Sequence, residues 1–191
     1  MGTEPLQRFR VLIVPGLNGS GVEHWQSHWE RRFPYFERVH QLAPHIPDLP
    51  VWSAQLDSSL RQSDRPALIV AHSFGCLATV DLLRIGAKNV VAALLVAPAD
   101  PWKFGVASAL KSARLPCPSI VVGSMNDPWM RAQSAADWAH LWGSEFINAG
   151  YLGHINAESE LADWPSGIAL LTELAETAGT APKRHYVGAQ T

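Results

Sequence analysis

The chain contains one serine whose neighbours are typical of a catalytic nucleophile. Ser73 lies in "IVAHSFGC" (69–76), between a run of small apolar residues and a glycine two positions on. The usual nucleophile elbow reads G-x-S-x-G, and small residues are needed at both flanking positions because the tight turn brings backbones close together. Here Gly75 supplies the second glycine and Ala71 replaces the first, which adds one methyl group. The alternative is an ordinary strand–helix turn in which Ser73 caps the helix.

A serine hydroxyl is a poor nucleophile at neutral pH, so a base must accept its proton and a third group must orient that base. When a serine follows a strand in this way, the order along the chain is Ser, then Asp or Glu, then His. Asp127 in "VVGSMNDPWM" (121–130) and His154 in "AGYLGHINAE" (149–158) keep this order, each in a loop after a predicted strand. The pattern predicts a triad of Ser73, His154 and Asp127.

The two partners of the serine also have simpler interpretations. Asp127 precedes a proline, so its carboxylate could instead start a turn or cap the next helix. Asp100, which follows "VAPA" (96–99), is a rival for the orienting acid. His154 could be an exposed loop residue beside a glycine.

Stabilisation of an oxyanion needs backbone N–H groups that point at the developing charge. Phe74, the residue after the nucleophile, offers one such group. We expect the second in the glycine-rich loop "PGLNGSG" (15–21), with the N–H of Leu17 as first choice and that of Asn18 as second. This loop matches neither G-x-x-x-x-G-K-[ST] nor G-x-G-x-x-G, so nucleotide binding is not expected.

Aromatic and imidazole side chains follow the same loop. His24 and Trp25 are expected at or near the rim of the substrate pocket, Trp25 and Trp129 beside the substrate, and Asn18 is a further pocket candidate. His24 and His28 have the i, i+4 spacing of two metal ligands on a helix, but no third ligand of matching spacing is present. We therefore expect neither a metal nor a cofactor.

Short apolar runs alternate with helical patterns along the chain. Strands are expected over residues 10–16, 67–73, 90–99, 119–124 and 145–150. Helices are expected over residues 24–33, 53–63, 76–86, 135–142 and 168–179. The strands are apolar throughout, which is typical of a parallel sheet covered on both faces. The alternation predicts an α/β three-layer sandwich with a mostly parallel central sheet. Residues 100–118 have room for only one helix, so no large cap domain is expected and the site should be open.

Composition limits the classes of protein that fit. A chain of 191 residues with 47% hydrophobic and 17% charged residues predicts one globular domain over 1–178, with a mobile tail over 179–191. A net charge of −2 gives no reason to expect a nucleic acid or an anionic membrane as partner. The absence of a signal-like or membrane-spanning run predicts a soluble cytoplasmic protein. The two cysteines, Cys76 and Cys117, are expected to be free thiols.

Five motifs carry a resemblance to a known family. In chain order they read "VPGLNGSGVEHWQSHWE" (14–30), "VAHSFGCLA" (70–78), "LVAPAD" (95–100), "SMNDPW" (124–129) and "GHIN" (153–156). From about residue 10 to about residue 175 the chain resembles the retinoblastoma-binding protein 9 family of small serine hydrolases. The resemblance implies an α/β-hydrolase fold without a large cap and a triad at Ser73, Asp127 and His154.

The family is named after an L-x-C-x-E motif that binds pocket proteins in some members. This chain reads Leu115-Pro-Cys117-Pro-Ser119, with serine in place of glutamate. Binding of a pocket protein is therefore not expected.

These observations together predict a serine hydrolase that cleaves carboxylic esters or other activated acyl groups through an acyl-enzyme. Its expected partner is a small-molecule acyl substrate. Two alternatives stay open at this point: a catalytically weak binding module on a hydrolase scaffold, and an acyltransferase.

Overall fold

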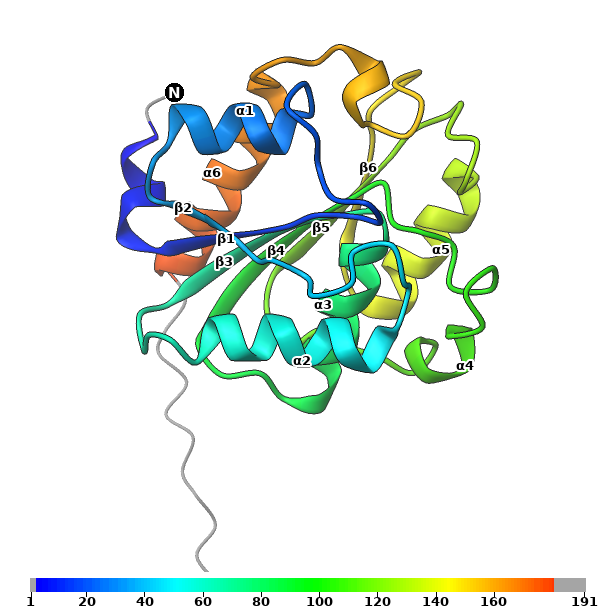
Figure 1. Ribbon diagram of the computed structural model, residues 1–191, viewed down its shortest axis with the longest axis horizontal. Helices are drawn as coiled ribbons and strands as arrows, with labels where there is room; N and C mark the ends of the chain where they lie inside the picture. The colour runs from blue at the N-terminus through cyan, green and yellow to red at the C-terminus, as the bar shows by residue number, and fades with distance from the viewer. Residues whose placement is uncertain (1–2, 181–191) are drawn as a thin grey trace, which may run out of the picture.

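The structure is a computed structural model that describes residues 3–180. Six strands form one sheet in the order β2-β1-β3-β4-β5-β6, and every neighbouring pair is parallel. The strands are β1 (Arg10–Val14), β2 (Phe36–Arg38), β3 (Ala67–His72), β4 (Val90–Val96), β5 (Ser119–Gly123) and β6 (Glu145–Asn148) (Figure 1). The α/β class and the parallel sheet predicted from the sequence are confirmed.

Six α-helices and two short 3-10 helices connect and cover the strands. They are η1 (Glu4–Arg8), α1 (Trp25–Arg32), α2 (Leu49–Leu60), α3 (Phe74–Ile85), α4 (Ala107–Leu110), α5 (Ala132–Trp142), η2 (Ala157–Ser159) and α6 (Pro165–Thr180). Between β4 and β5 the chain forms only the four-residue α4. No large cap domain is present in the described part of the chain. Residues 179 and 180, which were expected in the tail, belong to α6, and from residue 181 on the tail lies outside the described residues.

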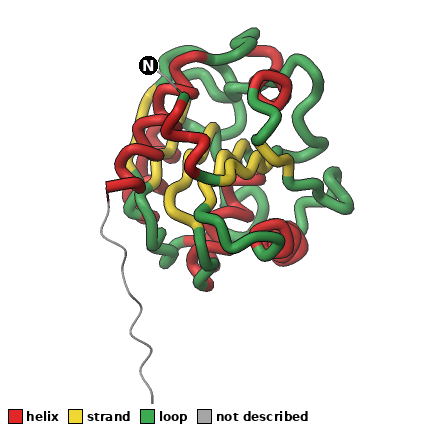
Figure 2. Tube along the Cα trace, turned by 90° about the vertical axis from the view of Figure 1, so that its left-hand side faces the viewer, coloured by secondary structure: helices red, strands yellow, loops and turns green. Residues whose placement is uncertain are grey.

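The strands separate two apolar cores, which makes the three layers. Along β1, Leu12 and Val14 pack into the core under α2, α3, α4 and α5, whereas Val11 and Ile13 pack into the core under α1 and α6. Successive side chains of a strand point to opposite faces, so a strand between two cores is apolar at every position. Figures 1 and 2 show helices on both sides of the strands.

One strand was not predicted, and several element boundaries differ from the expectation. Strand β2 was not predicted because it has three residues and only Phe36 among them is buried. Helix α2 begins at Leu49, four residues early, because Asp48 accepts the N–H of Val51 as N-cap and Pro50 lies in the first turn, where no N–H is needed. Strand β4 ends at Val96 because the next residue has a positive φ of 44°.

Both cysteines are free. Cys76 is fully buried in α3, and its Sγ donates to the carbonyl oxygen of Val96 at 3.4 Å. Burial raises the pKa of the Cys76 thiol well above its usual value and that of Cys117 to about 11. Neither thiol is poised to react in the native state.

Within the part of the chain that is described, no helix combines the length and the apolar character needed to cross a membrane.

The strand order creates a switch point between β1 and β3 at the carboxyl edge of the sheet. After β1 the chain adds β2 on one side, and it then returns to add β3 on the other side. The loops that leave β1 and β3 therefore diverge between these two strands, at their carboxyl ends. Open parallel sheets bind their ligands at such a switch point, and both loops contain residues singled out above.

Candidate active site

Ser73 lies in a sharp turn between β3 and α3. Its backbone has φ of 53° and ψ of −122°, a region that non-glycine residues rarely occupy. The turn approaches the end of β1 so closely that a Cβ on Gly75 would lie 2.5 Å from the carbonyl oxygen of Pro15. Ser73 occupies the N-cap position of α3, yet its side chain makes no capping hydrogen bond. The geometry is that of a nucleophile elbow.

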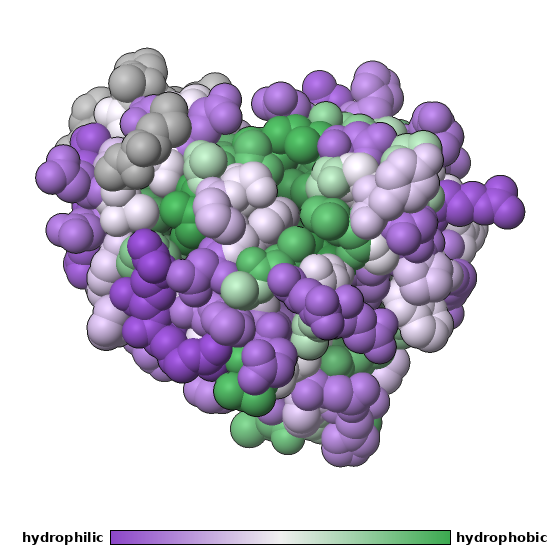
Figure 3. All heavy atoms as spheres, turned by 90° about the horizontal axis from the view of Figure 1, so that it is seen from above, coloured by the Kyte–Doolittle hydropathy of each residue, from purple (hydrophilic) through white to green (hydrophobic). Residues whose placement is uncertain are grey.

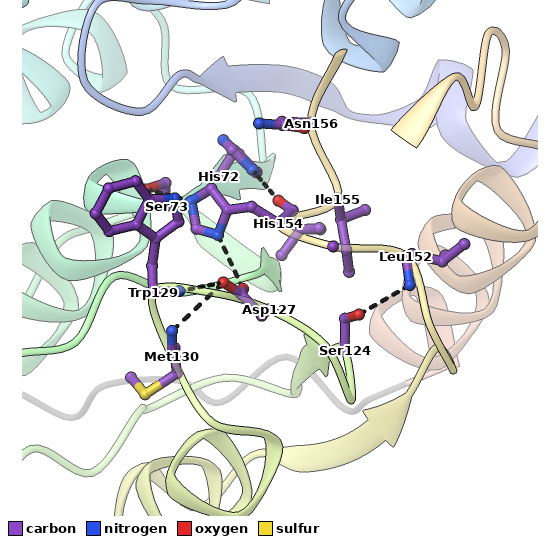
Figure 4. Close-up of polar contacts among 12 residues, drawn as sticks. His72, Ser73, Ser124, Asp127, Trp129, Met130, Leu152, His154, Ile155 and Asn156 are labelled. Carbon is purple, nitrogen blue, oxygen red and sulfur yellow. Dashed lines mark hydrogen bonds and ion pairs between the residues drawn. The ribbon is translucent and has the colours of Figure 1, made fainter. Parts of the chain in front are cut away.

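A continuous row of hydrogen bonds connects the three side chains that the sequence singled out. Oγ of Ser73 lies 2.9 Å from Nε2 of His154, and Nδ1 of His154 lies 2.8 Å from Oδ2 of Asp127 (Figure 4). A carboxylate only accepts hydrogen bonds, so Nδ1 carries the imidazole proton and Nε2 is free to accept the serine hydroxyl. The side chains of His154 and Asp127 are 10% and 2% exposed, so little water competes for these bonds.

The second carboxylate oxygen of Asp127 is also engaged. Oδ1 accepts the backbone N–H groups of Trp129 at 2.8 Å and Met130 at 3.4 Å. The turn-forming role considered for Asp127 thus coexists with its contact to His154. The rival acid, Asp100, accepts the N–H of Trp102 at 3.0 Å, and it lines the same pocket without a hydrogen bond to the histidine.

Two side chains after β5 hold the loop that contains His154. Oγ of Ser124 accepts the N–H of Leu152 at 2.9 Å, and Oδ1 of Asn126 accepts the N–H of Gly153 at 2.8 Å. Ser124 and Asn126 belong to the motif that contains Asp127, but no sequence pattern pointed to this role. The loop after β5 therefore supplies the acid and also fixes the loop of the histidine.

The two backbone donors proposed for an oxyanion are unoccupied. Among the described residues, the N–H groups of Phe74 and Leu17 have no hydrogen-bond acceptor. The N–H of Asn18, the second choice, donates to the carbonyl oxygen of Pro44 at 2.8 Å. Leu17 and Asn18 both line the pocket. Asn18 is thus already engaged, and Phe74 and Leu17 remain the expected pair of donors.

A buried amide fixes the loop between β1 and α1. Nε2 of Gln26 donates to the carbonyl oxygens of Val14 at 3.3 Å and Val70 at 3.2 Å, near the ends of β1 and β3. Its Oε1 accepts the hydroxyl of Ser20 at 2.6 Å. Gln26 is fully buried and was not identified from the sequence, because nothing in a lone glutamine reveals its partners.

His24 is buried and neutral. Its Nδ1 accepts the N–H of Gln26 at 3.1 Å, so the proton is on Nε2. Burial is the main cause that lowers the pKa of His24 to about 3, and the charge of Arg38 and the neighbouring His154 lower it further. The metal pair considered for His24 and His28 gains no third ligand, since the described residues contain no group of three or more metal-ligating side chains.

These loops surround a pocket of about 650 Å³ above Ser73. Of the residues expected there, the pocket is lined by Leu17, Asn18, His24, Trp129 and the two catalytic candidates Ser73 and His154. The expectation for Trp25 was wrong. Its side chain is 1% exposed and packs in the core, where its indole N–H donates to the carbonyl oxygen of Ile155 at 2.8 Å.

The loop after β4 adds a wall that the sequence did not indicate. Lys103 and Phe104 line the pocket. The ammonium group of Lys103 donates to the carbonyl oxygen of Trp129 at 2.6 Å and lies 5.8 Å from the centre of its ring. Trp129 is 59% exposed. Figure 3 shows a face on which apolar side chains gather at the centre, with polar side chains around them.

The comparisons with known proteins identify a family and agree with the fold. Residues 11–173 match the protein family described as "Serine hydrolase". This chain belongs to the serine hydrolase family. A solved structure of a YdeN-like hydrolase from Pectobacterium atrosepticum is 38% identical, covers 92% of this chain and 95% of its own, and superposes with a TM-score of 0.88.

More distant structures share the fold. The ydeN gene product of Bacillus subtilis is 18% identical, with coverage of 88% of this chain and 99% of its own and a TM-score of 0.72. A carboxylesterase from Bacillus cereus is 14% identical, with coverage of 90% and 89% and a TM-score of 0.60. A search of curated protein sequences finds no match. Family membership and the first neighbour support hydrolase activity in this member of the serine hydrolase family.

Proposed function

We propose that the protein hydrolyses carboxylic esters or other activated acyl groups through an acyl-enzyme. One observation carries the proposal: a hydrogen-bonded row runs from Asp127 through His154 to Ser73, and both His154 and Ser73 line an open pocket. A hydroxyl that already points at the free nitrogen of a neutral imidazole is arranged for deprotonation as it attacks.

In the first half-reaction Oγ of Ser73 attacks the acyl carbon while Nε2 of His154 accepts the hydroxyl proton. The carboxylate of Asp127 favours the imidazolium that forms, and the N–H groups of Phe74 and Leu17 bind the oxyanion. Collapse of the tetrahedral intermediate breaks the bond to the leaving group, which takes the proton from His154. The acyl group is then esterified to the serine.

In the second half-reaction water replaces the leaving group. His154 accepts a proton from the water as its oxygen attacks the acyl carbon, and it returns the proton to Oγ as the acid product departs. The open pocket and the absence of a large cap in the described chain allow water to enter.

The test uses S73A together with the native protein. We expect the native protein to react with a fluorophosphonate probe and to turn over p-nitrophenyl acetate, and S73A to lose both properties while its urea unfolding curve stays close to native. A folded native protein that the probe does not label would indicate a binding module. Acyl transfer to an added alcohol in preference to water would indicate an acyltransferase.

We also propose that, within the serine hydrolases, the chain belongs with the retinoblastoma-binding protein 9 group, on the five motifs given above. Binding of a pocket protein is not part of this proposal. Ser119 replaces the glutamate of L-x-C-x-E, and it is buried in β5, where its hydroxyl lies 2.7 Å from that of Ser144.

A further inference from the structure

His72 contacts the backbone of the residue proposed as the base. Its Nε2 lies 2.9 Å from the carbonyl oxygen of His154 (Figure 4). Because a carbonyl oxygen only accepts, Nε2 carries the proton and His72 is the donor. His72 immediately precedes Ser73, so two successive residues contact His154. His72 binds the carbonyl group of His154, and Ser73 contacts its imidazole ring.

The ring of His72 has a fixed place between two other imidazoles. Its centroid lies 4.7 Å from that of His24 and 4.9 Å from that of His154, and both pairs meet edge to face. His72 is 5% exposed. Burial lowers its pKa well below the usual value, and the neighbouring histidines lower it further. The ring therefore stays neutral when His154 takes up a proton.

The backbone around His154 depends on such side-chain bonds. His154 lies in no helix or strand, and its two neighbours, Gly153 and Ile155, have positive φ values of 56° and 46°. One backbone bond closes this turn, from the N–H of Ile155 to the carbonyl oxygen of Leu152 at 3.0 Å, and it does not engage the carbonyl group of His154. The carbonyl group of His154 has His72 as its partner.

We propose that His72 is a positioning residue, whose Nε2–H fixes the carbonyl of His154 and thereby the separation of the imidazole from the Ser73 hydroxyl. The inference rests on the proposed function of that site. Without this bond the peptide group after His154 loses its partner and can shift, and a displacement of about 1 Å in a catalytic group costs on the order of 100-fold in rate.

The experiment compares two substitutions of His72. H72L fills the space but donates no hydrogen bond, whereas H72Q places an amide N–H near the position of Nε2. We expect H72L to lower kcat for p-nitrophenyl acetate roughly 10- to 100-fold with a smaller change in KM, because His72 lines the pocket but acts on the arrangement of the reacting groups through His154. We expect H72Q to recover most of that loss.

T172V is the matched control for stability. Thr172 is buried in α6, and its hydroxyl donates to the carbonyl oxygen of Ile168 at 2.8 Å, so T172V removes a buried hydrogen bond outside the pocket. Urea unfolding of all variants shows whether each is folded during the assay. T172V should keep the native kcat even where its unfolding midpoint falls.

A readout without turnover separates this inference from the proposed function. The low-field proton resonance of His154 Nδ1–H reports its bond to Asp127, and we expect it to persist in H72Q and to broaden or shift in H72L. A folded H72L with native kcat and a native resonance would overturn the positioning role, as would an H72Q as impaired as H72L. If instead the native protein itself fails to react with the probe while the resonance responds as expected, the proposed function fails and the positioning of His154 by His72 stands.

Discussion

At the scale of single residues, the orientation of Asp127 is determined from both sides. Its Oδ1 accepts two backbone N–H groups in the turn that follows, while Oδ2 faces Nδ1 of His154. An amide at this position would keep an oxygen toward the backbone donors, since only oxygen accepts there. Its NH₂ group would then face the histidine.

D127N should therefore force the wrong tautomer of His154. The amide NH₂ would donate to Nδ1 and move the imidazole proton to Nε2, which could no longer accept the proton of Ser73. We expect kcat for p-nitrophenyl acetate to fall by roughly three to four orders of magnitude, with an unfolding midpoint close to native. D100N is the comparison variant, because Asp100 faces the same pocket without touching the histidine. A larger loss in D100N than in D127N would assign the acid to Asp100.

At the scale of elements, the site depends on how closely the turn after β3 approaches the end of β1. The approach leaves no room for a side chain at Gly75, where a Cβ would meet the carbonyl oxygens of both Val14 and Pro15 within 2.6 Å. Backbone atoms cannot move aside as a flexible side chain can. The same two strand ends are joined by the buried amide of Gln26.

G75A should consequently be destabilised and impaired in catalysis. The added methyl group pushes the elbow away from the loop that contains Leu17, and overpacking of this kind costs roughly 1–3 kcal/mol. We expect a lower midpoint in thermal unfolding and a lower kcat than native. G21A is the stability control, since a Cβ on Gly21 meets nothing within 4 Å; equal midpoints for the two variants would contradict the steric argument.

At the scale of the whole molecule, its stability should depend on pH through buried neutral histidines. In the folded state the pKa of His24 is about 3, against an ordinary value of 6.5. Between these values the unfolded chain binds more protons than the folded one, so the free energy of unfolding falls as the pH decreases from about 6.5 toward 3.

H24N should reduce this dependence, because asparagine preserves a cap for the N–H of Gln26 but takes up no proton. For one such histidine we expect the native free energy of unfolding to fall by roughly 2 kcal/mol more than that of H24N between pH 7 and pH 5. Urea unfolding at the two pH values measures the difference. H45N, a change at an exposed histidine, should retain the native pH dependence. An identical loss in native protein and H24N would show that His24 is not buried in its neutral form.

Elements and site residues could be predicted from the sequence where a residue's role is local or follows from the order of the strands. Apolar runs located five of the six strands, and the strand-end positions of Ser73, Asp127 and His154 placed them at one edge. Contacts across the sheet were not predictable: neither Gln26 nor His72 belongs to a pattern that reveals a partner 44 or 82 residues away. Trp25 was misplaced for the same reason, since only the fold determines whether an aromatic ring beside a pocket faces it or the core.

The burial of Cys76 has a practical consequence. Cys76 lies three residues after Ser73 and is fully buried in the core as a free thiol. A maleimide added to native protein can therefore modify it only during a transient opening of α3. The modification rate therefore measures how often the nucleophile's own helix opens, and it can be followed by mass spectrometry with no substrate present. Covalent occupancy of Ser73 by a probe should slow that rate to the extent that the acylated site holds the helix closed.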